Sequence, residues 1–179
     1  RRVAEVEEAS GKLAPVSRGL LDSLEWRKPI EQRPVDDAYE HISVTQLLNA
    51  HAKASVYHRD FFCAAVDWLL PIRRLASCSP QSLAIALHAL AKLAPEVHAA
   101  GEKELAQLRS LFTAAAPEVV RRADAFSIQN LVNVVAAFSH LGLWEPAMLK
   151  EALRCLLNQR AAWKTQDVAN LASALARLG

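Results

Sequence analysis

The pattern of apolar positions in residues 127–142 predicts a helix that is buried on most sides. Apolar residues at helical spacing, among them Leu131 and Val135, form a broad stripe that neighbouring helices must cover. Ser127 is suited to cap the start of this helix, and Gly142 is suited to end it in a left-handed conformation.

A narrow polar stripe follows the same predicted helix. Gln129, Asn133 and His140 lie at offsets 0, 4 and 11, and Ala136 lies at offset 7. At about 100° per residue these offsets share one face of a helix.

The same arrangement returns elsewhere in the chain. A degenerate copy begins at Thr45, with Asn49 in the place of Asn133. The first positions, Thr45, Gln81, Gln129 and Gln166, are 36, 48 and 37 residues apart. A period near 37 residues with one insertion of about 11 residues indicates a repeat protein. The stripe positions of the two clear copies are Gln81, Ile85, His88 and Lys92, and Gln166, Asn170, Ser173 and Arg177.

The stretches between these helices predict a partner helix for each. We expect partner helices in residues 58–75, which Pro71 should kink or split, in residues 111–123, which contain Pro117, and in residues 147–162. Residues 96–109 hold the insertion, and a helix should run from Asp36 and Asp37 toward Ser55. The predicted fold is all-α: an α-solenoid of antiparallel helix pairs, each covering its neighbour.

Two regions follow from this pattern. Residues 1–42 should form an N-terminal segment with a helix over residues 15–27 and a proline-containing linker. Residues 43–179 should form the repeat array. Because the array stops after a first helix without its partner, we expect the chain to be a fragment of a longer protein.

Composition favours this fold and excludes several functions. The 179 residues are 52% hydrophobic with only 5 Gly and 2 Tyr, which favours helix over sheet. The net charge of +2 is too small to indicate a nucleic-acid partner by itself. The three cysteines lack metal-ligand spacing, which predicts free thiols in a reducing compartment. No apolar run is long enough for a membrane span.

Catalytic patterns are missing from the sequence. The histidines are scattered, the adjacent acids lie near irregular segments, and no glycine-rich phosphate loop is present. Cys63 and Cys155 lie on apolar helix faces, where a buried thiol is expected rather than a nucleophile. We therefore expect no enzyme activity, cofactor, metal or small-molecule substrate.

The repeated motifs carry a family resemblance. The segments PQSLAIALHALAKLA, IQNLVNVVAAFSHLG and TQDVANLASALARLG, with Phe126 and Trp163 just before two of them, resemble octotricopeptide and heptatricopeptide repeats of organelle RNA-binding proteins. They are also similar to the helical region of FAST-kinase-like proteins that carry a C-terminal RAP domain. The resemblance covers residues 43–179 and departs from the pattern in the first unit, at Ile85 and in the 48-residue step. No RAP domain is visible.

The resemblance implies a location and a partner. Such proteins act in mitochondria or chloroplasts on transcript maturation, stability and translation, and similar ones are built into the mitochondrial ribosome. The implied partners are organelle rRNA or mRNA and neighbouring proteins of a ribonucleoprotein assembly, with no membrane. The alternative function is a protein-binding scaffold of the armadillo or HEAT kind without RNA.

Two sets of side chains are candidates for RNA contact. The amides of the stripe can hydrogen-bond base edges, or can instead bond neighbouring helices. The basic side chains at the last position of the stripe can reach RNA phosphates. Alternatively, their positive charge can complement the negative end of the helix dipole. Arginine pairs eight and seven residues before two repeat glutamines predict contact with the RNA backbone, although solvated helix ends would look alike. The predicted RNA-binding residues are Arg73, Arg74, Lys92, Arg121, Arg122, Gln129, Asn133, His140, Arg160, Gln166, Asn170 and Arg177.

Overall fold

The structure, a computed structural model, describes residues 38–179 and the side chains from residue 44 onward. The predicted helix over residues 15–27 and the linker lie outside this part. The described chain is helical and contains no strand, which confirms the all-α prediction. Its elements are α2 (Ala38–Ala54), α3 (Arg59–Leu69), α4 (Ile72–Ser77), α5 (Pro80–Lys92), α6 (Ala94–Ala100), α7 (Glu102–Arg121), η2 (Ala123–Ala125), α8 (Ile128–His140), α9 (Pro146–Asn158), η3 (Arg160–Ala162) and α10 (Thr165–Leu178).

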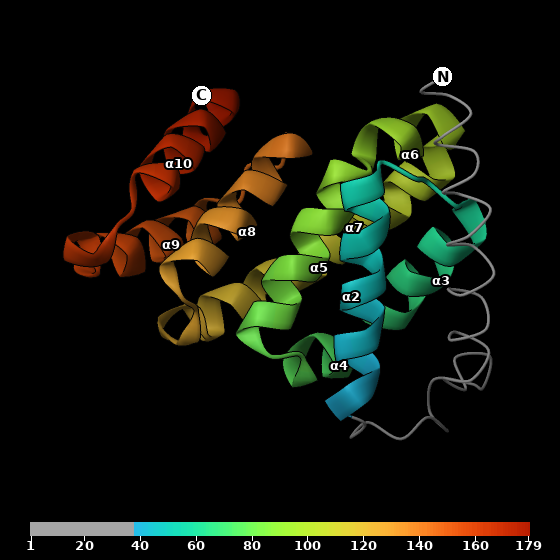
Figure 1. Cartoon of the computed structure of the whole chain (residues 1–179), viewed down its shortest axis with the longest axis horizontal. Coiled ribbons are helices and arrows are strands. Elements are labelled where there is room, and N and C mark those ends of the chain that lie inside the picture. The colour runs from blue at the N-terminus through green and yellow to red at the C-terminus, as the bar shows by residue number, and fades with distance from the viewer. Residues whose placement is uncertain (1–37) are drawn as a thin grey trace.

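The four repeat helices lie side by side in chain order. Helix α2 packs on α5, α5 packs on α8, and α8 packs on α10, and these are the most extensive contacts between elements (Figure 1). We call these four helices the first row. Helices α5 and α8, which carry the broadest buried faces, each lie between two first-row neighbours.

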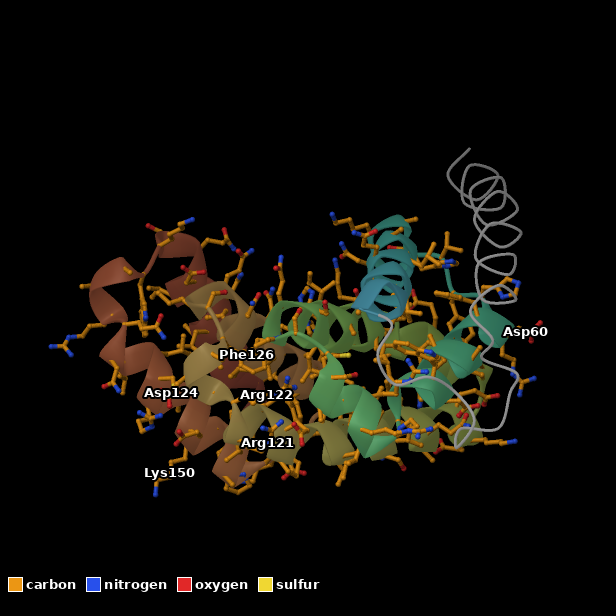
Figure 2. The ribbon with its side chains drawn as sticks, turned by 90° about the horizontal axis from the view of Figure 1, so that it is seen from below. Asp60, Arg121, Arg122, Asp124, Phe126 and Lys150 are labelled. Atoms are coloured by element: carbon orange, nitrogen blue, oxygen red, sulfur yellow. The ribbon has the colours of Figure 1, made fainter. Side chains whose placement is uncertain are left out.

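The partner helices form a second row. Helices α3 and α4 both pack on α7, and α7 packs on α9. Figure 2 shows Arg121 and Lys150, from α7 and α9, along one side of the molecule. These charged groups are exposed to solvent, whereas the apolar residues of α7 and α9 are buried in the protein.

The ends of the helices agree with the sequence. The hydroxyl oxygens of Ser79 and Ser127 accept hydrogen bonds from the backbone N–H groups of Ser82 and Asn130, at 3.0 and 3.3 Å. Gly142 follows α8 with a φ of 61°, as the predicted left-handed stop requires.

Proline acts differently at its two internal positions. Pro71 separates α3 from α4, as predicted, whereas Pro117 lies inside an uninterrupted α7. Pro117 is exposed, so its ring is accommodated on the solvent side of α7.

The insertion forms α6 and the first half of α7. Gly101 joins the two helices with a φ of 152°, and a Cβ at this position would lie 3.0 Å from Oε2 of Glu104. The backbone conformation therefore favours glycine, and a larger residue would also require the Glu104 carboxylate to shift by a few tenths of an ångström. Glu104 is itself buried and accepts a hydrogen bond of 2.7 Å from Nε of Arg59, which fastens α7 to α3.

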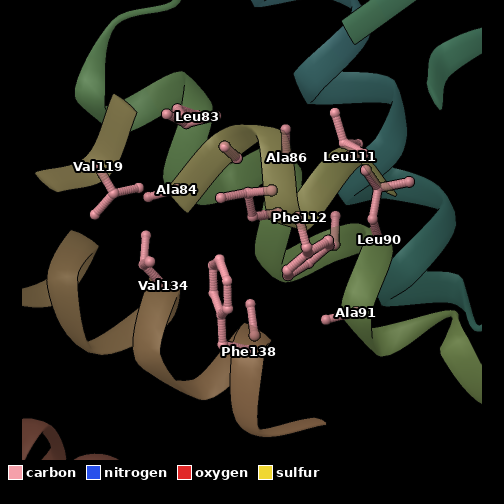
Figure 3. Packing of buried hydrophobic residues seen from close by; sticks show 14 of the residues in the cluster. Leu83, Ala84, Ala86, Leu90, Ala91, Leu111, Phe112, Val119, Val134 and Phe138 are labelled. Atoms are coloured by element: carbon pink, nitrogen blue, oxygen red, sulfur yellow. The ribbon is translucent and has the colours of Figure 1, made fainter. Parts of the chain in front are cut away.

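The core lies between the two rows. Leu131 and Val135 are fully buried, as predicted. Phe112 of α7 and Phe138 of α8 meet edge to face with their ring centroids 5.0 Å apart (Figure 3). Because aromatic rings and alanines interlock here, a change of volume on either row is transmitted to the other.

Candidate nucleic-acid interface

The first and last stripe residues of α5, α8 and α10 are exposed along the first row, whereas between them Ile85, His88 and Asn133 are half-buried and Ala136 is buried. Gln81, Gln129 and Gln166 are exposed at the starts of their helices. Lys92, His140 and Arg177 are exposed at the ends of the same helices. Each helix therefore has a side-chain amide at its start and a basic side chain at its end. The three helices pack next to one another in the first row.

The first copy of the repeat has a different register from the predicted one. Thr45 is buried, whereas Gln46 and Lys53 are exposed. The stripe of α2 therefore starts at Gln46, and Lys53 at offset 7 takes the place of His88 in α5. The shared Thr-Gln dipeptide at residues 45–46 and 165–166 was the sequence signal for this register.

A hollow separates the starts of α8 and α10. It has a volume of about 440 Å³, and its lining includes Gln129, Gln159 and Gln166 together with the side chain of Lys164. The carboxylate of Asp167 also lines it, but it is buried and accepts the backbone N–H of Lys164 at 3.0 Å. The hollow thus gathers side-chain amides from both first-row helices, the groups that can pair with the edges of bases.

The two stripe asparagines differ in their contacts. Asn170 is exposed, and its Oδ1 accepts a hydrogen bond of 2.8 Å from Nε2 of Gln166, one turn earlier on α10. Asn133 is half-buried and forms no side-chain hydrogen bond within residues 44–179. In this part of the chain, the alternative in which Asn133 bonds a neighbouring helix is therefore not observed.

The basic side chains at the ends of these helices interact electrostatically. The pKa of His140 is lowered by partial desolvation of its ring, and further by the positive charges of Arg177 and Lys92. The guanidinium of Arg177 also donates a hydrogen bond of 3.4 Å to the hydroxyl of Ser139 on α8. The basic side chains of Lys92, His140 and Arg177, on three adjacent helices, are therefore close enough to influence one another electrostatically.

Acidic residues are concentrated outside the first row. From residue 44 onward, the first-row helices contain a single acid, Asp167, which caps its own helix. The other described acids belong to the second row, α6, η2 or the connections. This separation could not be inferred from a net charge of only +2, because it depends on which helices share a face.

Two of the predicted backbone-binding arginines have structural roles instead. Arg74 is buried, with its guanidinium carbon 4.6 Å from the centre of the Trp68 ring. Arg122 donates hydrogen bonds of 2.7–3.2 Å to the carbonyl oxygens of Leu75, Ala76 and Cys78. These interactions occupy both guanidinium groups inside the protein, so we remove both residues from the predicted phosphate row.

The remaining arginines of that row are not equivalent to one another. Arg121 is exposed and pairs with Glu118, one turn earlier, at 2.6 Å. Arg73 is half-buried, and Arg160 is exposed on η3. Equal spacing in the sequence therefore does not give one continuous row of free charges on this side.

One exposed aromatic was missed by the sequence analysis. Trp144 is 61% exposed in the connection between α8 and α9, four residues after His140. An exposed indole provides a surface on which a base can stack. Its position outside any helical pattern gave no sequence signal.

A cluster of acids and a thiol on the second row is an ion-pair site. The carboxylates of Asp124 and Glu151 accept hydrogen bonds of 2.9 and 2.7 Å from Arg154, and the Cys155 thiol donates to Asp124. Burial and this hydrogen bond raise the pKa of Cys155 to about 11. A protonated thiol is a weak nucleophile, and Arg154 occupies both carboxylates as their ion-pair partner.

Comparison of the chain with protein-family models, curated proteins and solved structures finds no match. Within residues 38–179, no helix is both long and apolar enough to cross a membrane.

Proposed function

We propose that this chain is an RNA-binding helical-repeat protein, an α-solenoid of antiparallel helix pairs that binds a single strand along the first-row face. The observation that carries the proposal is the repeated chemistry of four adjacent helices. Each carries an exposed glutamine, at the start of α5, α8 and α10 but in the middle of α2, and a basic residue in its second half. From residue 44 onward, none of the four helices carries an exposed carboxylate.

The proposed division of labour follows from these groups. Amides such as Gln129 and Gln166 hydrogen-bond base edges, whereas Lys92, His140 and Arg177 neutralise phosphates. Neighbouring helices are spaced at roughly 10 Å, a step that an extended or compact single strand can match. Trp144, exposed in the connection after α8, offers an additional stacking surface.

The resemblance to organelle RNA-binding repeats supports a mitochondrial location, with a chloroplast as the alternative. The RNA is then an organelle rRNA or mRNA, and membership of a mitochondrial ribosome would place neighbouring proteins against the second row. The second candidate is a protein-binding scaffold, for which the same positive face would accept an acidic partner.

The test compares three variants in binding to short single-stranded RNAs of unrelated sequence. Replacing Lys53→Gln together with Arg177→Gln should weaken binding to all of them and reduce the slope of log Kd against log salt by about 1.4, since each neutralised phosphate contributes roughly 0.7. Gln129→Ala with Gln166→Ala should change the preference among RNAs without changing that slope. Lys150→Gln, exposed on α9, is the matched control and should bind like the parent.

Either of two results would contradict this proposal. One is a Lys53→Gln/Arg177→Gln variant that binds as tightly as the Lys150→Gln control at every salt concentration. The other is a parent protein that binds acidic peptides but no RNA, which would support the scaffold function.

A further inference from the structure

A second hollow lies at the C-terminal ends of α5 and α8, where the inserted segment meets these two helices. It has a volume of about 430 Å³, and four basic side chains line it. Each comes from a different helix: Lys92 from α5, His98 from α6, Arg109 from α7 and His140 from α8. We call it the basic hollow.

The basic hollow is a product of the insertion. His98 and Arg109 both belong to the inserted residues 96–109, which lengthen the step between repeats to 48 residues. The unit that follows has a 37-residue step and no equivalent of α6. The insertion therefore adds two basic side chains, His98 and Arg109. A repeat without the insertion would supply only Lys92 and His140 here.

Within residues 44–179, the charges of the basic hollow have no acidic partner. No aspartate or glutamate lines it, and Glu96, on the same short helix as His98, is not among its lining residues. Within residues 44–179, none of the four bases forms an ion pair with a carboxylate. Four basic groups that converge without an acid repel one another when protonated, and an anion between them would relieve this repulsion.

Helix ends alone do not account for this arrangement. Lys92, His98 and His140 lie in the last turns of α5, α6 and α8, where a positive charge complements the helix dipole. Arg109 lies in the middle of α7 and is exposed, with no hydrogen bond or ion pair within residues 44–179. Its guanidinium is the group that the dipole explanation leaves unexplained.

The rest of the lining indicates the class of ligand. Apolar residues, including Pro95, Leu105 and Leu141, complete the walls. The volume lies in the range of roughly 300–1,000 Å³ that is usual for small-molecule sites. A basic group of anchors beside an apolar surface suits a phosphate joined to a sugar and a flat base, because guanidinium binds phosphate through paired hydrogen bonds.

We propose that the basic hollow binds one nucleotide through its phosphate, with Arg109 and Lys92 as the fixed charges and His98 and His140 as additional donors. The inference rests on the proposed RNA-binding function and makes the insertion an anchor for one position of the strand. The nucleotide belongs to the bound RNA, either at an internal phosphodiester or at a phosphorylated 5′ end.

The first experiment measures RNA affinity of the 179-residue chain against salt. Arg109→Gln should weaken binding several-fold and reduce the salt slope by about 0.7, the contribution of one neutralised phosphate. Lys103→Gln, exposed on the same helix but outside the basic hollow, is the matched control and should leave both unchanged. Circular dichroism should show both variants folded, because Arg109 has no described partner to lose.

Two RNAs that differ only at the 5′ end separate the sources of phosphate. If a 5′ phosphate strengthens binding relative to a 5′ hydroxyl, and Arg109→Gln removes the difference, the basic hollow holds the terminal phosphate. If both RNAs lose the same factor in Arg109→Gln, it holds an internal phosphodiester. Equal behaviour of Arg109→Gln and Lys103→Gln with every RNA overturns the proposal.

The second experiment separates this inference from the proposed function. Adenosine monophosphate and inorganic phosphate are titrated while the imidazole NMR signals of His98 and His140 are followed, with His98→Gln and His140→Gln used to assign them. If the parent binds no RNA but the nucleotide shifts both signals, and Arg109→Gln abolishes the shift, the site stands and the RNA function fails. If RNA binding depends on Gln129 and Gln166 but neither probe nor Arg109→Gln has an effect, the RNA function stands and the site fails. The absence of every response refutes both.

Discussion

Arg122 should stabilise the fold, although its neighbour Arg121 should not. Its guanidinium reaches the end of α4, where the carbonyl oxygens of Leu75, Ala76 and Cys78 accept its hydrogen bonds. The last carbonyl groups of a helix have no hydrogen-bond partner within that helix. Arg122, the residue that follows α7, therefore caps the C-terminus of α4.

The size of the effect follows from these three bonds. Each hydrogen bond to a charged group contributes about 1.5–3 kcal/mol when it is lost, but removing one side chain also releases its conformational entropy of roughly 2 kcal/mol. Three such bonds together contribute about 4.5–9 kcal/mol, so after the entropy term Arg122→Ala should lower the free energy of unfolding by about 2.5–7 kcal/mol, well above the typical point mutation. For a chain of this length, that corresponds to a fall in Tm of roughly 5–28 °C.

Denaturant unfolding followed by circular dichroism measures this change. Arg122→Lys should recover only part of the loss, because one ammonium group cannot span three carbonyls. Arg121→Ala is the matched control: its exposed ion pair with Glu118 should leave the midpoint nearly unchanged. An Arg122→Ala protein with parental stability but weakened RNA binding would refute this reasoning and restore Arg122 to the phosphate row.

Two further predictions concern the core and the histidines. Val135→Asp places an unpaired charge in a fully buried position and should cost 3 kcal/mol or more, whereas Val168→Asp, 46% exposed, should unfold like the parent; equal midpoints would contradict the packing of α8. His51, His88 and His140 have pKa values below the usual 6.5, mainly because of burial. Below about pH 6.5 the unfolded chain therefore takes up protons more readily, and stability should fall between pH 7 and 5; rising stability over this range would contradict the lowered pKa values.

The positions of the helices could be predicted from the sequence because their causes are local. The apolar period placed α5, α8 and α10, the serines before α5 and α8 cap them, and Pro71 divides α3 from α4. Leu131 and Val135 could be assigned to the core for the same reason, since a stripe that broad must be covered. The α-solenoid itself, with its antiparallel pairs, stays a prediction.

The register of α2 shows where local pattern was insufficient. Thr45 and Gln46 both suit the first position of the stripe by spacing, and they differ in burial. Packing buries Thr45 and exposes Gln46, so the tertiary structure decides between two alignments that differ by one residue.

The sequence by itself determined which segments are helical and which of their faces are apolar, whereas the tertiary structure decided which charges are free. Arg121 and Arg122 are neighbours with the same chemistry, yet one is exposed and the other bonds carbonyls 44–47 residues away in the chain. Arg109 gained its significance in the same way, because only folding brings α7 beside the ends of α5 and α8. Helix formation depends on neighbours within about four residues, but the environment of a charged side chain depends on segments that meet only when the rows pack.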